Sequence, residues 1–567
     1  MNATCERVDL SEVDIRQALT SAQAVLPPAV FKPLETVAQA YLTMVNILDA
    51  KNMTIARLRK MVFGPTSESS RQVLVPPSLS DDSKTGQTKT RRPPPGHGRN
   101  GHSDYPTAKT QTVAHHKLAS GDRCPGCRKG KVYNQNERPG ILVRVTGQPP
   151  LAATVYHLQK LRCNLCLEIF EADPPEGVGR QKYDESAASM IALFKYGGGF
   201  PWNRLGKLQN CLGIPLPPST QWDIVQSAAQ SLWPIFEELQ RQAAQGKLIH
   251  NDDTAMKILE RMGKRREQAL LMAPESAPAT LRVQGHAPTV ATGDCRGAAD
   301  QGDKTPPSPE RTGVFTSGIV SQVQEHKIAL FFTGVRHAGE NLHTLLLKRG
   351  RTLRPPIQMC DALSSNLPKP LRTILANCLA HGRRQFVELL GNFPDECAYI
   401  LRALGRVYKN DAIARKRKLS NTERLKFHKA RSGPRMEKLH EYLHALTRDK
   451  KVEPNSSLGE AINYMLKHWE KLTLFLSKAG APLDNNICER ALKMAILHRK
   501  NSLFYKTDNG AHTGDLYMSF IHTCDLNDVD PFDYLTQLQR HAKEVRTQPG
   551  QWMPWTYRRT ISRSPPR

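Results

Sequence analysis

The chain has 567 residues, and its 80 Lys and Arg against 53 Asp and Glu give a formal net charge of +27. This length exceeds one hydrophobic core at about 100 to 200 residues per domain, so we expect several domains. The charge predicts a polyanionic partner, with nucleic acid favoured over a membrane surface. No apolar run reaches the roughly 18 residues that span a bilayer, and the acidic start lacks the layout of a signal peptide. We therefore expect no membrane partner and a cytoplasmic, nucleoid-associated protein.

Near the amino terminus, steps of alternately three and four residues from 34 to 62 meet apolar side chains at eight of nine positions. This heptad pattern predicts one helix, which either packs on its own domain or forms a coiled-coil dimer. The stretch that follows, 72–120, is rich in Pro, Ser, Thr, Lys and Arg and cannot bury a core. We interpret it as a basic linker, either a solvated tether or a segment that follows a DNA groove.

Four cysteines occur as two C-x2-C pairs, Cys124 with Cys127 and Cys163 with Cys166, with 35 residues between the pairs. Two such turns can close a tetrahedral shell of four thiolates around one structural Zn²⁺, which leaves no open position for a substrate. The stretches 141–145 and 154–161 between them are rich in β-branched and aromatic residues and predict strands of a zinc ribbon. Two unrelated pairs of free cysteines and a redox pair are the alternatives.

The next region, 186–244, has a helical pattern. A helix at 203–212, a turn at Gly213 and a second helix starting near 220, with Ser219 as its N-cap, resemble a helix-turn-helix. Both a DNA-reading unit and an ordinary pair of packed helices fit this layout.

Two adjacent carboxylates lie in the segment 247–259, where strand alternation puts Asp252 and Asp253 on opposite faces. Strands at 313–320 and 327–332, a helix at 339–348 and a strand at 356–362 containing Asp361 follow. This is the order of a ribonuclease-H-like core, in which the first and fourth strands are neighbours. A later helix, which starts around 484–486, carries Glu489 in its first turns.

Three converging carboxylates suit phosphodiester chemistry, because two divalent ions about 3.5 to 4 Å apart activate the attacking oxygen and stabilise the leaving one. Carboxylate oxygens are the hard ligands that Mg²⁺ prefers. Composition and spacing alone do not select these three among 53 acidic residues, any of which can be a cap or a surface charge.

Several strings resemble the insertion-sequence-66 transposase family: LRKMVFGPTSES (58–69), HNDDT (250–254), CLAHGRRQF (378–386), LDNNICERALK (483–493), HRKNSLF (498–504) and DPFDYL (530–535). Their order matches too, and the similarity runs from about 34 to 545. Two positions depart from the family pattern: Asp253 stands where Glu is usual, and Ala362-Leu363 follow Asp361 in place of Gly-Tyr.

The resemblance implies a DDE transposase, with Asp252, Asp361 and Glu489 as its catalytic carboxylates and two Mg²⁺ (or Mn²⁺) as cofactors. Its partners would be double-stranded DNA at the transposon ends and the target, a second copy of the chain, and accessory proteins of the same element. A catalytically inactive, transposase-derived DNA-binding protein is the alternative, and a nonspecific nuclease is a third interpretation. Residues beside the acidic strings that are expected to contact DNA phosphates, or else to pair with surface carboxylates, are Arg383, Arg384, Arg490, Arg499 and Lys500.

Taken together, these features predict an α/β multidomain chain. The gap of 128 residues between Asp361 and Glu489 implies a helical insertion, and residues 404–440 within it carry 12 Lys or Arg against three acids, a balance of +9 that suits DNA phosphates or is a solvated face. A Cys378-x2-His381 pair inside CLAHGRRQF can be interpreted as metal ligands, but because it has no partner nearby in the sequence we expect it to serve packing. The predicted units are a coiled-coil helix (1–71), the linker (72–120), a zinc ribbon (121–175), a helical domain (176–245), a first core part (246–384) with a disordered loop (273–311), the insertion (385–478), a last core part (479–545) and a basic tail (546–567).

Overall fold

The computed structural model describes residues 12–24, 26–27, 30–36, 38, 117–133, 150–162, 169–263 and 313–563. Five predicted features lie outside these residues: most of the heptad helix at 34–62, nearly all of the linker, the strand at 141–145, the second cysteine pair and the loop at 273–311. In the described part, α1 (Glu12–Gln23) precedes a two-stranded antiparallel ribbon of β1 (Lys160–Arg162) and β2 (Ile169–Glu171).

A five-stranded sheet stands at the centre of the molecule, with strand order β5-β4-β3-β6-β7. The central strand β3 pairs antiparallel with β4 and parallel with β6, while β4–β5 is antiparallel and β6–β7 is parallel. The strands are β3 (Leu248–Met256), β4 (Val314–Val323), β5 (His326–Gly334), β6 (Ile357–Cys360) and β7 (Ile374–Asn377). The first four follow the predicted segments within a few residues, which confirms the predicted α/β class.

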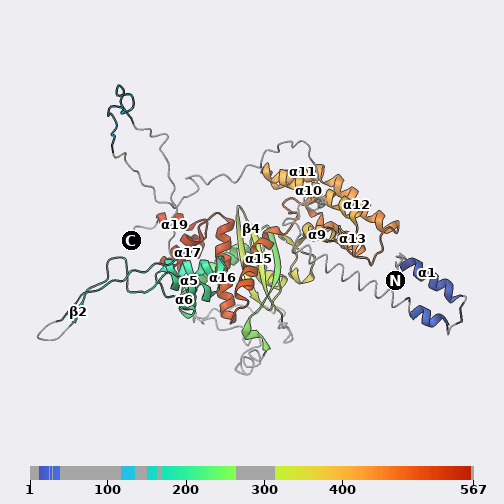
Figure 1. Ribbon diagram of the computed structural model, residues 1–567, viewed down its shortest axis with the longest axis horizontal. Helices are drawn as coiled ribbons and strands as arrows, with labels where there is room; N and C mark the ends of the chain where they lie inside the picture. The colour runs from blue at the N-terminus through green and yellow to red at the C-terminus, as the bar shows by residue number, and fades with distance from the viewer. Residues whose placement is uncertain are drawn as a thin grey trace, which may run out of the picture.

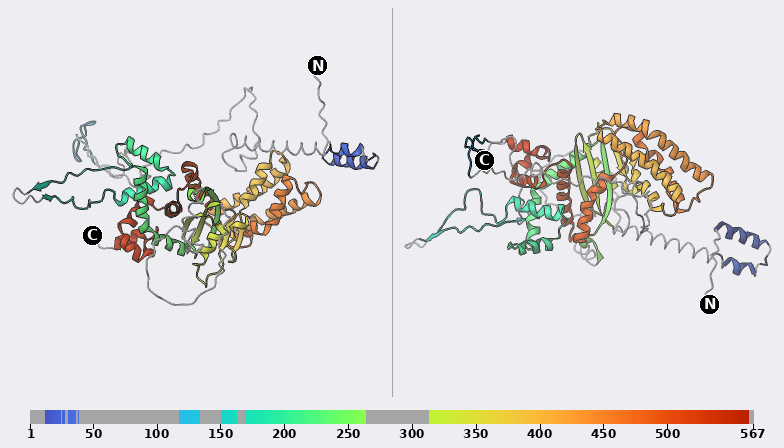
Figure 2. Two further views of the ribbon diagram at one scale, coloured as in Figure 1. Left: turned by 90° about the horizontal axis from the view of Figure 1, so that it is seen from below. Right: turned by 45° about the horizontal axis from the view of Figure 1, so that its top comes forward.

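Helices that precede β3 in sequence and helices from residue 486 onward share one hydrophobic core with this sheet (Figures 1 and 2). Tyr196 and Tyr517, more than 300 residues apart in the sequence, stack with ring centroids 5.4 Å apart inside this core. The segment predicted as a basic tail also packs there, through the buried Trp552, Met553 and Tyr557. The helices are α4 (Glu185–Ala192), the π-helix η2 (Leu193–Gly197), α5 (Trp202–Cys211), α6 (Pro218–Ala243), α15 (Asn486–Ser502), α16 (Asp508–Leu526), α17 (Pro531–Arg540), α18 (Ala542–Thr547), η6 (Pro549–Trp552) and α19 (Tyr557–Arg563). Of these helices, α15 packs against Gly318 of β4, whereas α6 meets the opposite face of that strand, where Ser321 Oγ donates to Ala243 O.

A second group of helices, between β7 and α15 in sequence, lies beside the β6–β7 end of the sheet and forms its own core with residues of these two strands (Figure 2). Ile357 and Met359 of β6 are part of this core, so the sheet and the helical group are joined by apolar packing. Its members are α9 (Leu379–Leu389), α10 (Pro394–Lys416), α11 (Asn421–Arg431), α12 (Gly433–Arg448), α13 (Ser457–Lys467), α14 (Trp469–Leu472) and η5 (Leu474–Leu476). The predicted insertion is therefore helical, as expected. Three short elements complete the core: η3 (Leu259–Arg261), α8 (Ala338–Leu346) and η4 (Ser364–Asn366).

Two local predictions are wrong. The N-cap of α6 is Pro217 and not Ser219, since Pro217 is extended and Pro218 already has the fixed φ that suits the first helical position. The predicted strand at 154–161 is irregular until residue 160; Val155 and Tyr156 are exposed, so no neighbouring surface stabilises an extended pairing there. The predicted turn at Gly213 is confirmed, with φ +78 in the left-handed region.

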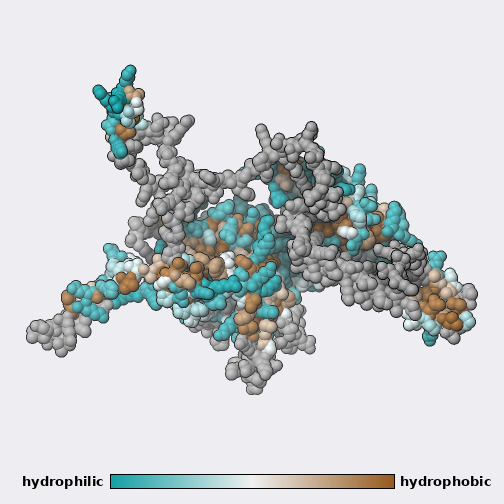
Figure 3. All heavy atoms as spheres, in the orientation of Figure 1, coloured by the Kyte–Doolittle hydropathy of each residue, from teal (hydrophilic) through white to brown (hydrophobic). Residues whose placement is uncertain are grey.

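The surface of the described part is largely hydrophilic on the face of Figure 3, with apolar groups interspersed. Among the described residues, no helix is both long and apolar enough to cross a membrane.

Candidate active site

Asp252 and Asp253 on β3 point to different surroundings, as strand alternation predicts. Asp253 Oδ1 accepts a hydrogen bond from Ser317 Oγ (2.7 Å), and its Oδ2 accepts one from Ala338 N (2.9 Å) and contacts His337 Nδ1 at 3.1 Å. These contacts fasten β4 and the start of α8 to the central strand. Asp253 therefore holds β4 and α8 on the central strand. Of the two adjacent carboxylates, Asp252 is the candidate metal ligand.

Asp361 follows the last residue of β6, the strand that lies parallel to β3. Its Oδ1 accepts hydrogen bonds from Leu363 N (3.1 Å) and from the Asn366 side chain, which fix the turn after the strand. The carboxyl thus stands at the end of the strand next to that of Asp252. This position matches the sequence-based expectation for the second carboxylate.

Glu489 lies in the first turn of α15, and buried polar contacts hold this helix start on the sheet. Asn485, which is fully buried, donates from Nδ2 to Asn251 O (3.1 Å), and its Oδ1 lies 3.0 Å from His250 Nδ1. Cys488 Sγ donates to Gly318 O at 3.2 Å. These bonds position the start of α15 beside β3, although Glu489 lies more than 200 residues after Asp252 in the sequence.

The negative charges of Asp361 and Glu489 lie close enough to Asp252 to affect the ionisation of its carboxyl. The pKa of Asp252 is raised from 3.8 to about 7, mainly because the group is buried and also because the negative charges of Asp361, Glu489 and Asp253 oppose its ionisation; a hydrogen bond from Asp253 N partly offsets this. Glu489 Oε1 is buried and accepts no hydrogen bond. Carboxylate oxygens, one of them without a hydrogen-bond donor, are ligands of the kind that a hard divalent cation prefers. The oxygens of Asp252, Asp361 and Glu489 do not, however, all lie within 4.8 Å of one another in the described part of the chain.

A second group of side chains surrounds Glu489 from α9. His381 Nε2 lies 3.9 Å from Glu489 Oε1, and Arg384 lies 4.0 Å from Oε2. Among the described residues, Cys378, His381 and Glu489 form the one group of at least three possible metal ligands, with ligand atoms within 4.8 Å of one another. The partner that the Cys378-x2-His381 pair lacked in the sequence is thus Glu489.

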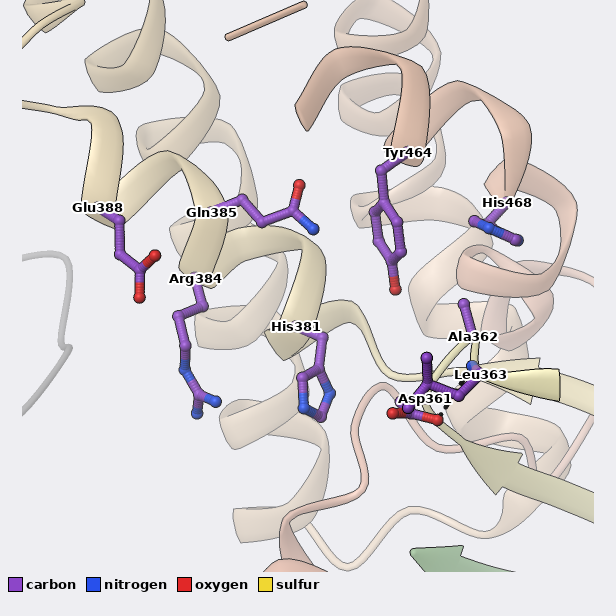
Figure 4. A pocket seen from close by; sticks show the side chains of 9 residues that line it. All are labelled: Asp361, Ala362, Leu363, His381, Arg384, Gln385, Glu388, Tyr464 and His468. Atoms are coloured by element: carbon purple, nitrogen blue, oxygen red, sulfur yellow. Dashed lines mark hydrogen bonds between the residues drawn. The ribbon is translucent and has the colours of Figure 1, made fainter. Parts of the chain in front are cut away.

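Cys378 and His381 nevertheless differ in their surroundings. Cys378 is fully buried, burial raises the pKa of its thiol to about 11, and its Sγ accepts a hydrogen bond from Asn485 N at 3.2 Å. The thiol therefore helps to hold the start of α15, in line with the expected packing role. His381 instead faces a hollow of about 350 Å³ beside Asp361 (Figure 4). Its lining residues are Asp361, Ala362, Leu363, His381, Arg384, Gln385, Glu388, Tyr464 and His468.

The five basic residues predicted to contact DNA are not equivalent. Arg383 is largely buried on α9, and Arg499 donates to Thr254 Oγ1 (3.1 Å) and to Ala255 O at the end of β3. Both are therefore integrated into the fold. Arg384 borders the hollow, while Arg490 and Lys500 are exposed on α15.

Sequence reasoning missed a network of buried amides that positions the site. Asn251 Nδ2 and Gln358 Nε2 both donate to Asn366 O (2.9 and 2.7 Å), and Gln358 Nε2 also donates to Asn251 Oδ1 (2.9 Å). With Asn485 these side chains tie β3, β6, η4 and α15 together. The available signal was weak: an Asn precedes Asp252, and another lies in the string that contains Glu489.

The first cysteine pair forms a tight turn. Cys124 N donates to Gly130 O and Arg128 N to Cys124 O, both at 2.8 Å, while Arg128 takes a left-handed φ of +57. Gly130 N points at Cys127 Sγ at 3.4 Å, and this backbone hydrogen bond is the main reason why the pKa of Cys127 is lowered. Amide groups that stabilise a thiolate suit a metal-binding turn. Cys163 and Cys166 lie outside the described residues.

Comparison with known proteins adds an independent observation. The sequence matches the Transposase IS66 family over residues 180–276 and 319–513, which includes all three carboxylates. It is 26% identical over 416 residues to the uncharacterized protein y4hP of Sinorhizobium fredii, covering 71% of this chain and 67% of that protein. It is also 26% identical over 378 residues to y4jD of the same organism, covering 65% of each. The chain thus spans about two thirds of the length of these relatives. Since the family match covers more than half of its residues, the chain belongs to the IS66 family of transposases.

Proposed function

We propose that this chain is a DDE transposase that binds the terminal inverted repeats of an insertion sequence, cleaves DNA there and joins the freed 3′ hydroxyl to target DNA. The observation that supports the proposal is that Asp361, directly after β6, and Glu489 on α15 lie near enough to Asp252 on β3 for their charges to help raise the pKa of Asp252. Membership of a transposase family makes DNA the partner.

The strand order supports a ribonuclease-H-like identity for the sheet. Three antiparallel strands, with the first one central, are followed by two strands parallel to it, and α15 packs on β3 and β4. In this arrangement three carboxylates would lie near one another. One is on the first strand, one is at the end of the fourth strand, and one is on a later helix. The helices α9 to α14 would then be an insertion before the last carboxylate.

We propose that two Mg²⁺ or Mn²⁺ ions are the cofactors and that Asp252, Asp361 and Glu489 would hold them, because carboxylates supply the hard oxygen ligands that these ions prefer. Such ions, when bound, activate an attacking oxygen and stabilise the leaving oxygen of a phosphodiester. The chain's own contribution is positioning: the amide network holds β6 and η4 on β3, and Asn485 holds the start of α15. Arg384 and His381, next to Glu489 and bordering the hollow, are placed to contact the DNA phosphate.

Other regions of the chain would bind DNA and hold two copies of the protein together. The 404–440 segment on α10 to α12, with its balance of +9, provides charge for DNA phosphates, and α5 and α6 provide a helix pair with the order of a helix-turn-helix. We also propose that Cys124 and Cys127 complete a zinc ribbon with Cys163 and Cys166 around one Zn²⁺. The heptad segment at 34–62 would form a coiled coil in a homodimer, and accessory proteins of the element would assist at the nucleoid.

The proposal is tested with supercoiled plasmid that carries the inverted repeats flanking the coding sequence. In Mg²⁺ the purified chain should nick this plasmid at the repeats and spare a plasmid without them. Asp252→Asn and Glu489→Gln should leave it intact, whereas Asp525→Asn, at an exposed carboxylate on α16, should cleave like the unaltered chain. Equal nicking by all four proteins would reject the catalytic assignment; repeat binding without any nicking would leave a DNA-binding protein, and nicking without preference for repeats would indicate a general nuclease.

A further inference from the structure

A pair of histidines on the outer surface of the helical group is not used by the proposed reaction. His440 and His444 occupy positions i and i+4 of α12, so both side chains emerge on one face of the helix. Leu439 and Leu443 of the same helix are buried in the core of the helical group, whereas His440 is half-buried and His444 is exposed. The two rings are therefore accessible from solvent.

The two Nε2 atoms lie 3.2 Å apart. Zinc–nitrogen bonds of 2.0 to 2.1 Å at a tetrahedral angle separate two ligand nitrogens by about 3.3 Å, so the spacing matches that of two ligands on one ion. His440 is also held in place, since its ring packs against Trp469 with centroids 4.5 Å apart. A single N–H···N hydrogen bond between the rings would have the same length, and the experiment below separates the two cases.

We infer that His440 and His444 form a binding site for a borderline divalent cation such as Zn²⁺ or Ni²⁺. Imidazole nitrogens suit these ions, whereas Mg²⁺ prefers oxygen ligands, so the site is chemically distinct from the carboxylates of the proposed active site. The inference does not depend on the proposed transposase activity.

The surroundings define what kind of site this is. A hollow of about 650 Å³ adjoins the pair and is lined by Tyr399, Lys438, His440, Glu441, Tyr442, His444, Ala445 and Arg448. The string His440-Glu441-Tyr-Leu-His444 has the H-E-x-x-H spacing, in which one face of a helix offers two imidazoles to a zinc ion and the Glu is not itself a ligand. No third protein ligand joins the pair within the part of the chain that the structure describes. The ion would keep open positions for water or an anionic group, next to the cationic Lys438 and Arg448.

The test is calorimetric titration of Ni²⁺ into the untagged, zinc-loaded full chain in buffer with excess Mg²⁺. We expect a saturable site that His440→Ala and His444→Ala each weaken by about tenfold or more, because each removes one of two ligands. Any Ni²⁺ bound by Cys378, His381 and Glu489 is a separate site that both substitutions leave unchanged. His326→Ala, at a histidine that stacks on Trp555 and lines neither hollow, is the matched control and should bind like the unaltered chain. Equal far-UV circular dichroism of all variants establishes that the helices are intact.

A second measurement locates the ion. Bound Ni²⁺ should quench tryptophan fluorescence through Trp469, so Trp469→Phe should remove the saturable quenching while the calorimetric site persists. Absence of a saturable Ni²⁺ site, or saturable Ni²⁺ binding that both histidine substitutions leave wholly unchanged, would overturn the inference and leave the pair as a hydrogen-bonded surface contact.

Discussion

Asp252 should lower the stability of the metal-free protein above neutral pH. In the unfolded chain this carboxyl ionises near its ordinary pKa of 3.8, but in the folded chain its pKa is about 7. Between these values the folded state binds the extra proton, so the free energy of unfolding falls as the pH rises from 3.8 to about 7. At about 1.36 kcal/mol for each tenfold change in proton affinity, the loss has an upper limit of roughly 4 kcal/mol.

Asp252→Asn removes this loss and keeps an oxygen that can accept the hydrogen bond from Asp253 N. We therefore expect the variant to be more stable than the unaltered chain at pH 8 without Mg²⁺, with a melting temperature higher by at least about 3 °C. Near pH 4 the difference should vanish, because both folded proteins are then uncharged at this position. Saturating Mg²⁺ at pH 8 should stabilise the unaltered chain and not the variant, since ligands that bind only the folded state raise its stability.

The assay is scanning calorimetry at pH 4, 6 and 8, with and without Mg²⁺, on zinc-loaded protein. Asp525→Asn is the control, because its carboxylate is more than half exposed and should show no such pH-dependent gain. A variant no more stable than the unaltered chain at pH 8, or a gain that is equal at pH 4 and pH 8, would refute the argument that burial and neighbouring carboxylates destabilise ionised Asp252.

Three further substitutions separate structural from chemical roles. Asp253→Asn should lower the free energy of unfolding by about 1 to 3 kcal/mol, since it weakens buried hydrogen bonds to β4 and α8, yet keep Mg²⁺-dependent cleavage; urea unfolding and plasmid nicking measure the two effects. Asn485→Ala should reduce cleavage at least about tenfold in protein that remains folded, because the start of α15 loses its bond to β3, and unchanged cleavage would contradict the positioning role. Cys124→Ser should lower the zinc content from about one ion per chain towards zero by elemental analysis, and normal zinc content would contradict the ribbon.

The sheet was largely predictable because its long strands carry strong signals. Alternation in the segment around Asp252 and the apolar runs of β4 and β5 gave strand positions that agree with the structure within a few residues. The four-residue β7 was missed, since so short a segment, placed directly before α9, has no measurable period. The error at Ser219 arose because two prolines, and not a side-chain cap, start α6.

Local context alone did not select the candidate site among 53 acidic residues; the resemblance to the insertion-sequence-66 family did. Local patterns then located Asp252 on a strand, Asp361 at the end of a strand and Glu489 at a helix start, and the structure has each of them there. The contact between His381 and Glu489 could not be predicted, because 108 residues separate them in the sequence (489 − 381). The buried amides are equally invisible from sequence, since their hydrogen bonds join segments more than 100 residues apart and amide side chains have no characteristic spacing.

The most direct test of the account is a change of metal preference at Asp361, the carboxylate with the weakest sequence context. A thiolate is a poor ligand for Mg²⁺ but binds the softer Mn²⁺. Asp361→Cys should therefore fail to cleave repeat-bearing plasmid in Mg²⁺ and regain cleavage in Mn²⁺, while the unaltered chain cleaves in both. Full activity of Asp361→Cys in Mg²⁺ would contradict a role for Asp361 as a metal ligand, and with it the convergence of three carboxylates on common ions.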